Sequence, residues 1–161
     1  NSNWGSARSI FHTINGKWYW EARLVAAGGS ALTGVCTSSA NLNSWLGHDA
    51  YGWGYDGSGL KYSSAVGTAY GAAYTTGDVI GVAVDLDADK IWFSKNGVWQ
   101  GGGNPVTGLS PAYSNVAGEI YAAAADGNNS GAAPTTTMNF GATAFAYTVP
   151  TGFQAGFGAL A

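Results

Sequence analysis

The sequence predicts an all-β fold, and three observations lead to this class. From Ile80 to Leu86 every second residue is a branched aliphatic one, which is the spacing that places side chains on one face of a strand. The pair Asn96-Gly97 tolerates the positive φ angles of a two-residue hairpin loop. Glycine occupies 26 of the 161 positions, and with β-branched residues it interrupts every candidate helix of more than about two turns. Short strands joined by turns are typical of a β-sandwich.

The first half of the chain supplies five expected strands. We expect the N-terminal residues up to Ser6 to be loose apart from Trp4. Residues 17–25 alternate, so Trp18 and Trp20 face the core while Tyr19, Glu21 and Arg23 form a polar outer side. The expected strands of this half are 10–13, 17–25, 32–37 and two short ones within 51–62, with a hairpin-type turn at 14–17 and loops at 38–50 and 63–76.

The second half is organised by a meander that continues from the alternating stretch. A four-residue turn sets Ile91 opposite Leu86, and the Asn96-Gly97 turn places Trp92 and Trp99 on the outer face. Triple glycine and two prolines exclude regular structure between residues 101 and 115. Further strands are expected at 120–125 and 135–140, followed by an apolar tail that ends near residue 153.

Composition bounds the domain and its partners. The length of 161 residues suits one domain, 1–161, with its core at about residues 10–153. Only 9% of residues are charged and the net charge is −3, so we expect no nucleic acid partner. No apolar run is long enough for membrane insertion. Because initiator Met and signal peptide are both missing, we expect a fragment of a longer protein, through which an oligomer would form.

Catalysis and metal binding find no support in the sequence. His12 and His48 are the two imidazoles, and neither lies in a nucleophile motif. Asp85, Asp87 and Asp89 alternate as in a calcium loop, but the required glycine and closing glutamate are missing. We therefore expect a charged hairpin turn there, no enzyme activity, no metal and no cofactor. Cys36 is the single cysteine, so an internal disulfide is impossible.

Seven sequence blocks follow one another in the order Gly16–Glu21, Gly34–Thr37, Trp53–Gly57, Gly77–Gly81, Asp85–Asp87, Ile91–Gly97 and Met138–Gly141. In this order they resemble a SPRY domain. The resemblance implies a SPRY-type bent β-sandwich of two antiparallel sheets with loops gathered on one rim. It also implies a non-catalytic recognition module for a peptide or protein surface. The charge-poor composition, rich in Ala, Gly, Thr and Asn, most resembles SPRY domains of tailed-phage and prophage tail-associated proteins.

The resemblance also implies where a ligand binds. Its rim corresponds to the segment before His12, the loop from Thr37 to Tyr51, and the turn 126–130. The candidate ligand-binding residues are Thr37, Ser38, Trp45, Leu46, Tyr51, Asn128 and Asn129. Because the loop is short and Asn128 stands where several relatives place a large aromatic residue, we expect a rather flat surface.

Three functions remain open at this point. The leading one is a phage tail or fibre adhesion domain that binds a host cell-surface glycan or protein. The second is a virion structural module that docks another tail subunit, and the third is an intracellular SPRY adaptor that binds a short peptide. The expected location is accordingly the virion (phage tail) or otherwise extracellular.

Overall fold

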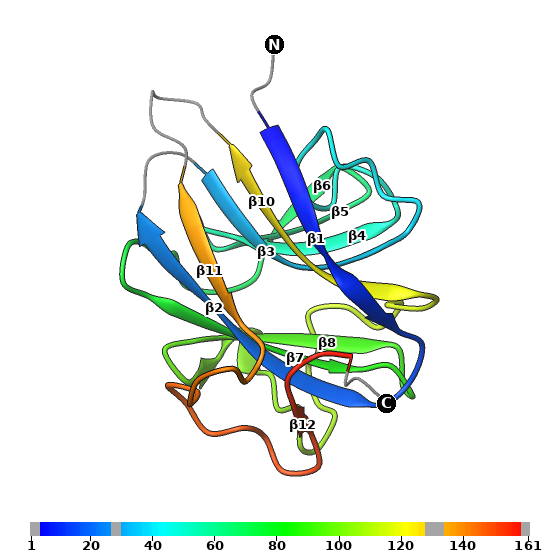
Figure 1. The fold of residues 1–161 in the computed structure, drawn as a ribbon, viewed down its shortest axis with the longest axis vertical. Helices are drawn as coiled ribbons and strands as arrows, with labels where there is room; N and C mark the ends of the chain where they lie inside the picture. The colour runs from blue at the N-terminus through cyan, green and yellow to red at the C-terminus, as the bar shows by residue number, and fades with distance from the viewer. Residues whose placement is uncertain (1–3, 27–29, 128–133, 159–161) are drawn as a thin grey trace.

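Two β-sheets pack face to face in the computed structural model, which describes residues 4–26, 30–127 and 134–158 (Figure 1). The first sheet has the order β1 (Trp4–Thr13), β10 (Ile120–Gly127), β3 (Ser30–Thr37), β4 (Gly52–Asp56), β5 (Leu60–Ser63), β6 (Val66–Ala69). The second has the order β11 (Thr135–Asn139), β2 (Lys17–Ala26), β7 (Val79–Asp85), β8 (Lys90–Lys95), β9 (Val98–Trp99). Neighbours in both orders are antiparallel, and β12 (Gln154–Ala155) adds to β2 in parallel. A 3₁₀ turn at Gln100–Gly102 is the one helical element of the described residues. The all-β, two-sheet prediction is confirmed.

The core lies between the inner faces of the two sheets, and the alternation of the sequence builds it. Trp20 of β2 and Val82 of β7 point into it, as their period-two patterns predict. Phe93 of β8 is fully buried and stacks on Tyr55 of the opposite sheet, with ring centroids 5.5 Å apart. Tyr70 closes the cluster with a centroid 6.1 Å from that of Phe93. Aromatic rings from both sheets thus meet at the centre of the sandwich.

The meander forms as predicted, with one change of register. Asn96 and Gly97 have φ angles of +48° and +80°, and Lys95 pairs with Val98, so they form the expected two-residue turn. Ile91 pairs with Val84, not with Leu86, which lies in the preceding turn. Because this shift is two residues, the apolar side chains keep the same face.

Most of the outer face of the second sheet around Tyr19, Glu21 and Trp92 is buried, which corrects the expectation of a polar, exposed side, although Arg23 is exposed as expected. Tyr19 and Trp92 are 1% and 0% exposed. The segment after β11 covers them: Phe145 lies edge-on to Tyr19 at 5.2 Å, and Phe153 lies edge-on to Trp92 at 6.4 Å between centroids. Glu21 shares this face and anchors the segment, as shown below. Periodicity within a strand does not reveal which distant segment covers its second face.

Two strand boundaries also differ from expectation. β1 starts at Trp4 and runs through the residues expected to be loose, because it pairs with β10 from Trp4 opposite Gly127 onwards. The turn after β1 leads from the first sheet to the second and so is not a hairpin. The expected loop at 63–76 contains the short edge strand β6, and it also carries Tyr74, which is 7% exposed.

The central aromatic cluster predicts a large loss of stability when it is truncated. Replacing Phe93 by Ala removes a fully buried ring and should lower the free energy of unfolding by about 3–5 kcal/mol in urea denaturation. Val98→Ala, at a position that is 66% exposed, is the control and should change it by about 0.5 kcal/mol or less. Equal losses in the two variants would contradict this position of the core.

Glu21 predicts a second, distinct loss of stability. Its carboxylate is 4% exposed and accepts hydrogen bonds from the backbone N–H groups of Ala146 and Tyr147, at 2.8 and 2.9 Å, and from the Tyr19 hydroxyl at 3.0 Å. Glu21→Gln replaces one acceptor by a donor, and an unpaired buried group costs about 1–3 kcal/mol. We expect that loss in urea denaturation, together with faster proteolytic cleavage within residues 140–157.

The control for Glu21 is a carboxylate of similar chemistry at the surface. Glu119 is 41% exposed in its ion pair with His12, so Glu119→Gln should cost about 0–1 kcal/mol and leave proteolysis unchanged. Unaltered cleavage in Glu21→Gln would show that this carboxylate does not hold the covering segment.

Candidate functional site

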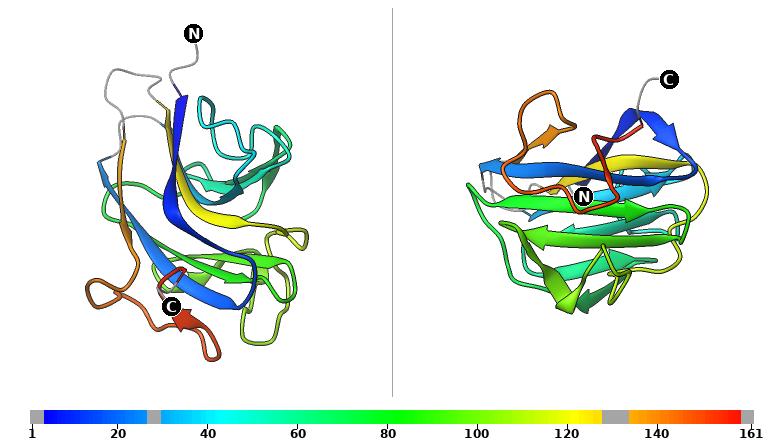
Figure 2. Two further views of the ribbon diagram at one scale, coloured as in Figure 1. Left: turned by 45° about the vertical axis from the view of Figure 1, so that its right-hand side comes forward. Right: turned by 90° about the horizontal axis from the view of Figure 1, so that it is seen from below.

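Two of the three parts of the predicted rim meet at one end of the first sheet, where the start of β1 lies beside the loop after β3 (Figures 1 and 2). Most of the third part, the turn 126–130, lies outside the described residues. The backbone N–H of Ser6 donates to the Leu42 carbonyl at 2.8 Å, and its hydroxyl donates to the Ser44 carbonyl at 2.6 Å. Arg8 Nη1 donates to the carbonyls of Thr37 and Ser38 at 3.1 and 2.8 Å. We call the surface formed by residues 4–8 and 37–51 the rim.

The loop of the rim is held in one conformation by its own polar groups. Asp49 accepts hydrogen bonds from the backbone N–H groups of Asn41 and Tyr51, at 2.8 and 2.9 Å. Gly47 has a φ of +88°, and a Cβ there would lie 2.3 Å from the Tyr62 carbonyl oxygen. A glycine is therefore required where the loop crosses β5. The rim is preorganised before any ligand arrives.

The predicted site residues fall into different environments on the rim. Ser38 is exposed, Thr37 is half-buried, and Tyr51 is 49% exposed. Leu46 is 3% exposed and packs with Leu32 and Cys36, so it supports the loop from beneath and offers no contact surface. Asn128 and Asn129 lie outside the described residues. Of the five predicted residues between positions 37 and 51, Ser38 and Tyr51 are exposed and Leu46 is buried. Thr37 and Trp45 are half-buried.

A pocket of about 240 Å³ opens beside this loop, and three half-buried aromatic rings surround it. It is lined by Trp4, Ser30, Leu32, Trp45, Asp56 and Tyr62, and we call it the aromatic pocket. The rings of Trp4 and Trp45 lie 6.1 Å apart at an angle of 58°. Trp45 also packs edge-on against His48 at 4.4 Å, and its buried indole N–H has no acceptor in the described residues.

Two glycines allow the walls of the aromatic pocket to form. Trp4 pairs with Gly127 across the strands, and a Cβ on Gly127 would lie 2.6 Å from the indole ring. Tyr62 pairs with Gly67 in the same way, and the corresponding distance to its ring is 2.6 Å. Each ring therefore lies flat over a neighbouring strand. Sequence analysis missed Trp4 and Tyr62 as site residues because an aromatic–glycine pair is visible only when the register is known.

The acidic group of the aromatic pocket is Asp56, the last residue of β4. Its side chain is 8% exposed, and Oδ1 accepts hydrogen bonds from the backbone N–H groups of Ser58 and Leu60 at 3.1 and 2.8 Å. The Ser58 hydroxyl also donates to it at 2.8 Å. These bonds fix the carboxylate in place. Within the described residues no cation forms an ion pair with it.

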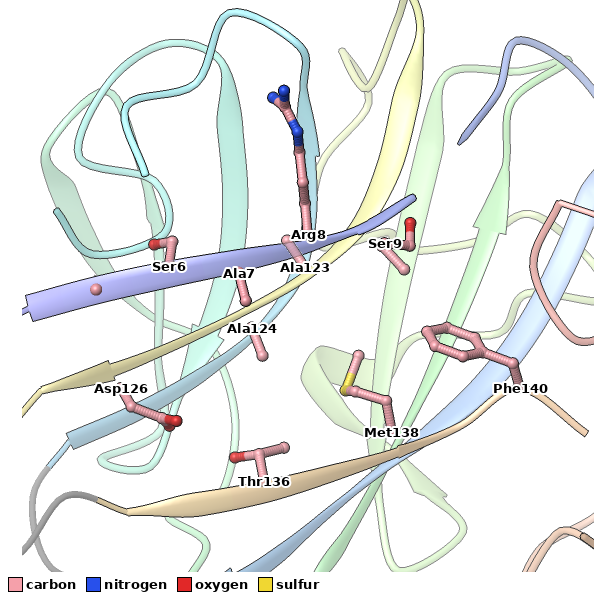
Figure 3. A pocket seen from close by; sticks show the side chains of 12 residues that line it. Ser6, Ala7, Arg8, Ser9, Ala123, Ala124, Asp126, Thr136, Met138 and Phe140 are labelled. Carbon is pink, nitrogen blue, oxygen red and sulfur yellow. The ribbon is translucent and has the colours of Figure 1, made fainter. Parts of the chain in front are cut away.

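A second concavity of about 420 Å³ lies on the other side of β1, between the open edges of the two sheets (Figure 3). Ala7, Ala124 and Asp126 point into it from the first sheet, and Thr136 and Met138 face them from β11 (Figure 3). The lining is mostly small, and Arg8 points away from the gap. We call this concavity the inter-sheet cleft.

Metal, redox and bilayer chemistry receive no support from the described residues. Among residues 4–26, 30–127 and 134–158 no three His, Cys, Asp or Glu side chains are placed to hold a metal ion. Asp85 pairs with Lys17 at 2.9 Å, and Asp87 accepts from the Gly16 backbone N–H at 2.9 Å, so both act in the turn. Burial raises the pKa of the Cys36 thiol to about 11. In the same ranges, no helix has the length and apolar character needed to cross a bilayer.

We expect the carboxylate of Asp126, in the inter-sheet cleft, to lower the stability of the fold in a pH-dependent way. Burial raises the pKa of its carboxyl, and Oδ1 is shielded without a partner in the described residues. A raised native pKa means that the charged form destabilises the fold: this cost is absent below the unfolded value of about 3.9 and grows as pH rises through the native pKa. Asp126→Asn should therefore raise the melting temperature more at pH 7 than at pH 4.

The control for Asp126 is Asp89, an exposed carboxylate in the turn between β7 and β8. Asp89→Asn keeps a residue type that tolerates its φ of +57°. The difference between variant and parent melting temperatures should then be the same at both pH values. If Asp126→Asn behaves identically, its carboxylate is not destabilised by burial.

Comparisons with known proteins identify the family. A SPRY domain model matches residues 17–139. Ran-binding protein 9 of Xenopus laevis is 37% identical over 86 residues, as are Ran-binding protein 10 of Danio rerio and Ran-binding protein 9 of Homo sapiens. Each match covers 51% of this chain but only 16%, 14% and 12% of the respective relative. The chain thus spans a small part of the length of the curated relatives it matches.

These matches correct two expectations drawn from composition. The expected virion or extracellular location is wrong, because the relatives are Ran-binding proteins 9 and 10 of vertebrates and not phage tail or other extracellular proteins. The particular similarity to phage tail proteins, with host adhesion and glycan binding, is likewise unsupported. What the family match does establish is a protein-interaction module. The chain belongs to the SPRY domain family.

Proposed function

We propose that this chain is the non-catalytic peptide-binding module of an intracellular adaptor, and that its rim is the binding surface. The observation that supports this most directly is the aromatic pocket, which opens beside Trp45 of the loop fixed by Asp49. Tyr51, at the end of the same loop, is exposed. The family match supports a protein or peptide partner. The similarity to Ran-binding proteins supports the intracellular setting.

The rim suits a peptide better than the inter-sheet cleft does. Binding energy at protein interfaces concentrates in Trp, Tyr and Arg side chains that fill or form pockets. Trp4 and Trp45 of the rim surround one small concavity together with Tyr62, and Tyr51 lies exposed on the same loop as Trp45. The cleft offers mainly Ala, Gly, Ser and Thr, and its one carboxylate is destabilised by burial. The larger volume of the inter-sheet cleft does not compensate for its lack of Trp and Tyr side chains.

The name of the relatives does not by itself assign a partner. Ran binding is attributed to proteins of which this segment corresponds to 16% or less. We therefore propose a short peptide segment of a protein partner without naming the protein. A peptide fits the geometry, because a pocket of about 240 Å³ is below the roughly 300–1,000 Å³ typical of sites for drug-sized molecules.

The rim predicts the effect of two substitutions on peptide binding. Peptides selected for this domain from a random 12-residue library displayed on yeast should lose at least about thirtyfold in affinity with Tyr51→Ala or Trp45→Ala, because truncating an aromatic anchor costs about 2 kcal/mol or more. Affinity is measured by fluorescence anisotropy of the synthetic peptides. Tyr51→Ala is the cleaner variant, since its ring is half exposed.

The matched control is Val98→Ala on β9 of the opposite sheet, an exposed apolar position away from the rim. It should bind the same peptides with unchanged affinity, and all three variants should keep the circular dichroism spectrum of the parent. Selected peptides that bind Tyr51→Ala and Trp45→Ala as tightly as the parent would exclude the rim as the binding surface.

A further inference from the structure

We propose that the aromatic pocket receives a basic side chain, arginine or lysine, of the bound peptide. The inference rests on the proposed function of the rim and adds the chemistry of the residue that the rim recognises. Three observations carry it: the arrangement of the rings, the buried carboxylate beside them, and the positions of the chain's own cations.

The rings provide the faces that a cation seeks. Trp4, Trp45 and Tyr62 line one small concavity, and Trp4 and Trp45 are inclined to each other by 58°. The negative electrostatic face of an aromatic ring attracts ammonium and guanidinium groups, and Trp is the most effective ring. Arginine and lysine also carry long apolar stems, which can pack against Leu32 in the wall of the pocket while the charged end group contacts polar atoms.

The carboxylate supplies the countercharge. Asp56 is 8% exposed and is oriented by hydrogen bonds from Ser58 and Leu60. Those donors are neutral, and no described Lys or Arg forms an ion pair with this carboxylate. A buried charge without an opposite charge is costly, and a ligand cation that enters beside it relieves that cost. A neutral ligand of the same shape gains only the contact with the rings.

No Lys or Arg of the chain fills this place. All six of these residues lie within the described ranges, and none of them forms an ion pair with Asp56. Lys17, Lys90 and Lys95 belong to the second sheet, and Arg23 of the same sheet is exposed. Arg8 binds the carbonyls of Thr37 and Ser38 and lies 4.7 Å above the Tyr121 ring. Lys61, close to Asp56 in sequence, is turned to the Ala112 carbonyl at 2.6 Å.

Cation–π contacts of this kind already occur elsewhere in the protein, between its own cations and its own aromatic rings. Lys61 Nζ lies 4.8 Å from the centre of the Tyr113 ring and 5.6 Å from that of Tyr70. Arg8 stacks on Tyr121 in a comparable way. The aromatic pocket combines such rings with a carboxylate, and no Lys or Arg is among the described residues that line it. A volume of about 240 Å³ is suited to one long side chain.

The first test uses single-residue probes and the indole signals of the domain. Nα-acetyl-arginine methylamide and Nα-acetyl-lysine methylamide are titrated against ¹⁵N-labelled protein at constant ionic strength. The indole N–H signals of Trp4 and Trp45 should shift, while that of Trp99 on the opposite sheet should not. The neutral analogue Nα-acetyl-citrulline methylamide should bind at least about tenfold more weakly, because it keeps the shape and loses the charge.

Two variants show whether the rings and the carboxylate cause the effect. Tyr62→Leu keeps an apolar side chain but removes a ring, and Asp56→Asn keeps an acceptor oxygen for Ser58 and Leu60 but removes the charge. Both should reduce the response to the basic probes about tenfold or more, whereas Val98→Ala should not. Equal shifts from citrulline and arginine analogues, or an unchanged response in Asp56→Asn, would overturn the proposal.

The peptides selected on yeast separate failure of this inference from failure of the proposed function. Rim-dependent peptides that contain an essential basic residue and lose affinity for Asp56→Asn support both. Rim-dependent peptides that tolerate citrulline in place of each arginine, glutamine in place of each lysine and Asp56→Asn overturn the cation site while the rim remains the binding surface. Peptides indifferent to Tyr51→Ala and Trp45→Ala overturn the rim, and the probe titration then decides the cation site alone.

Discussion

The pairing of β1 with β10 is the constraint on which the rim depends. It places Trp4 opposite Gly127, where the indole lies flat on the glycine, and it extends the first sheet beneath the loop that ends at Tyr51. Successive side chains of β1 then point to opposite faces of the first sheet. Ser6 and Arg8 bond to the loop, whereas Ala7 points into the inter-sheet cleft (Figure 3). One edge strand thereby separates an aromatic concavity from one lined by small side chains.

Much of the fold follows from the sequence because two signals are local. The period-two stretch before Leu86 and the Asn96-Gly97 turn each specify a conformation from neighbouring residues alone, and both form as predicted. The burial of Glu21 and Trp92 is different in kind, because it depends on a segment more than fifty residues away in the chain. β1 was missed in part for the same reason: its small and polar residues extend only because β10 offers them a partner.

The candidate site was predictable to a smaller extent. Trp45 and Tyr51 stand out because they lie in a loop with no period that would bury them, and the family resemblance placed that loop on the rim. Leu46 has the same local context, but its side chain is buried against Leu32 and Cys36 because the loop crosses β5 at Gly47. Trp4 and Tyr62 require knowledge of which glycine lies opposite. The phage assignment failed because amino-acid usage reports how a surface is solubilised and not which protein carries the domain.

Rigidity and charge together explain how so small a surface can be selective. Asp49 and Arg8 form hydrogen bonds with backbone groups of the rim, and Asp56 does so with the turn between β4 and β5, so binding need not order the loop. A rigid site loses less entropy on binding, and a few anchors then suffice for affinity. Because so few residues are charged and Lys61 and Arg8 are already engaged, the carboxylate in the aromatic pocket acts without local competition.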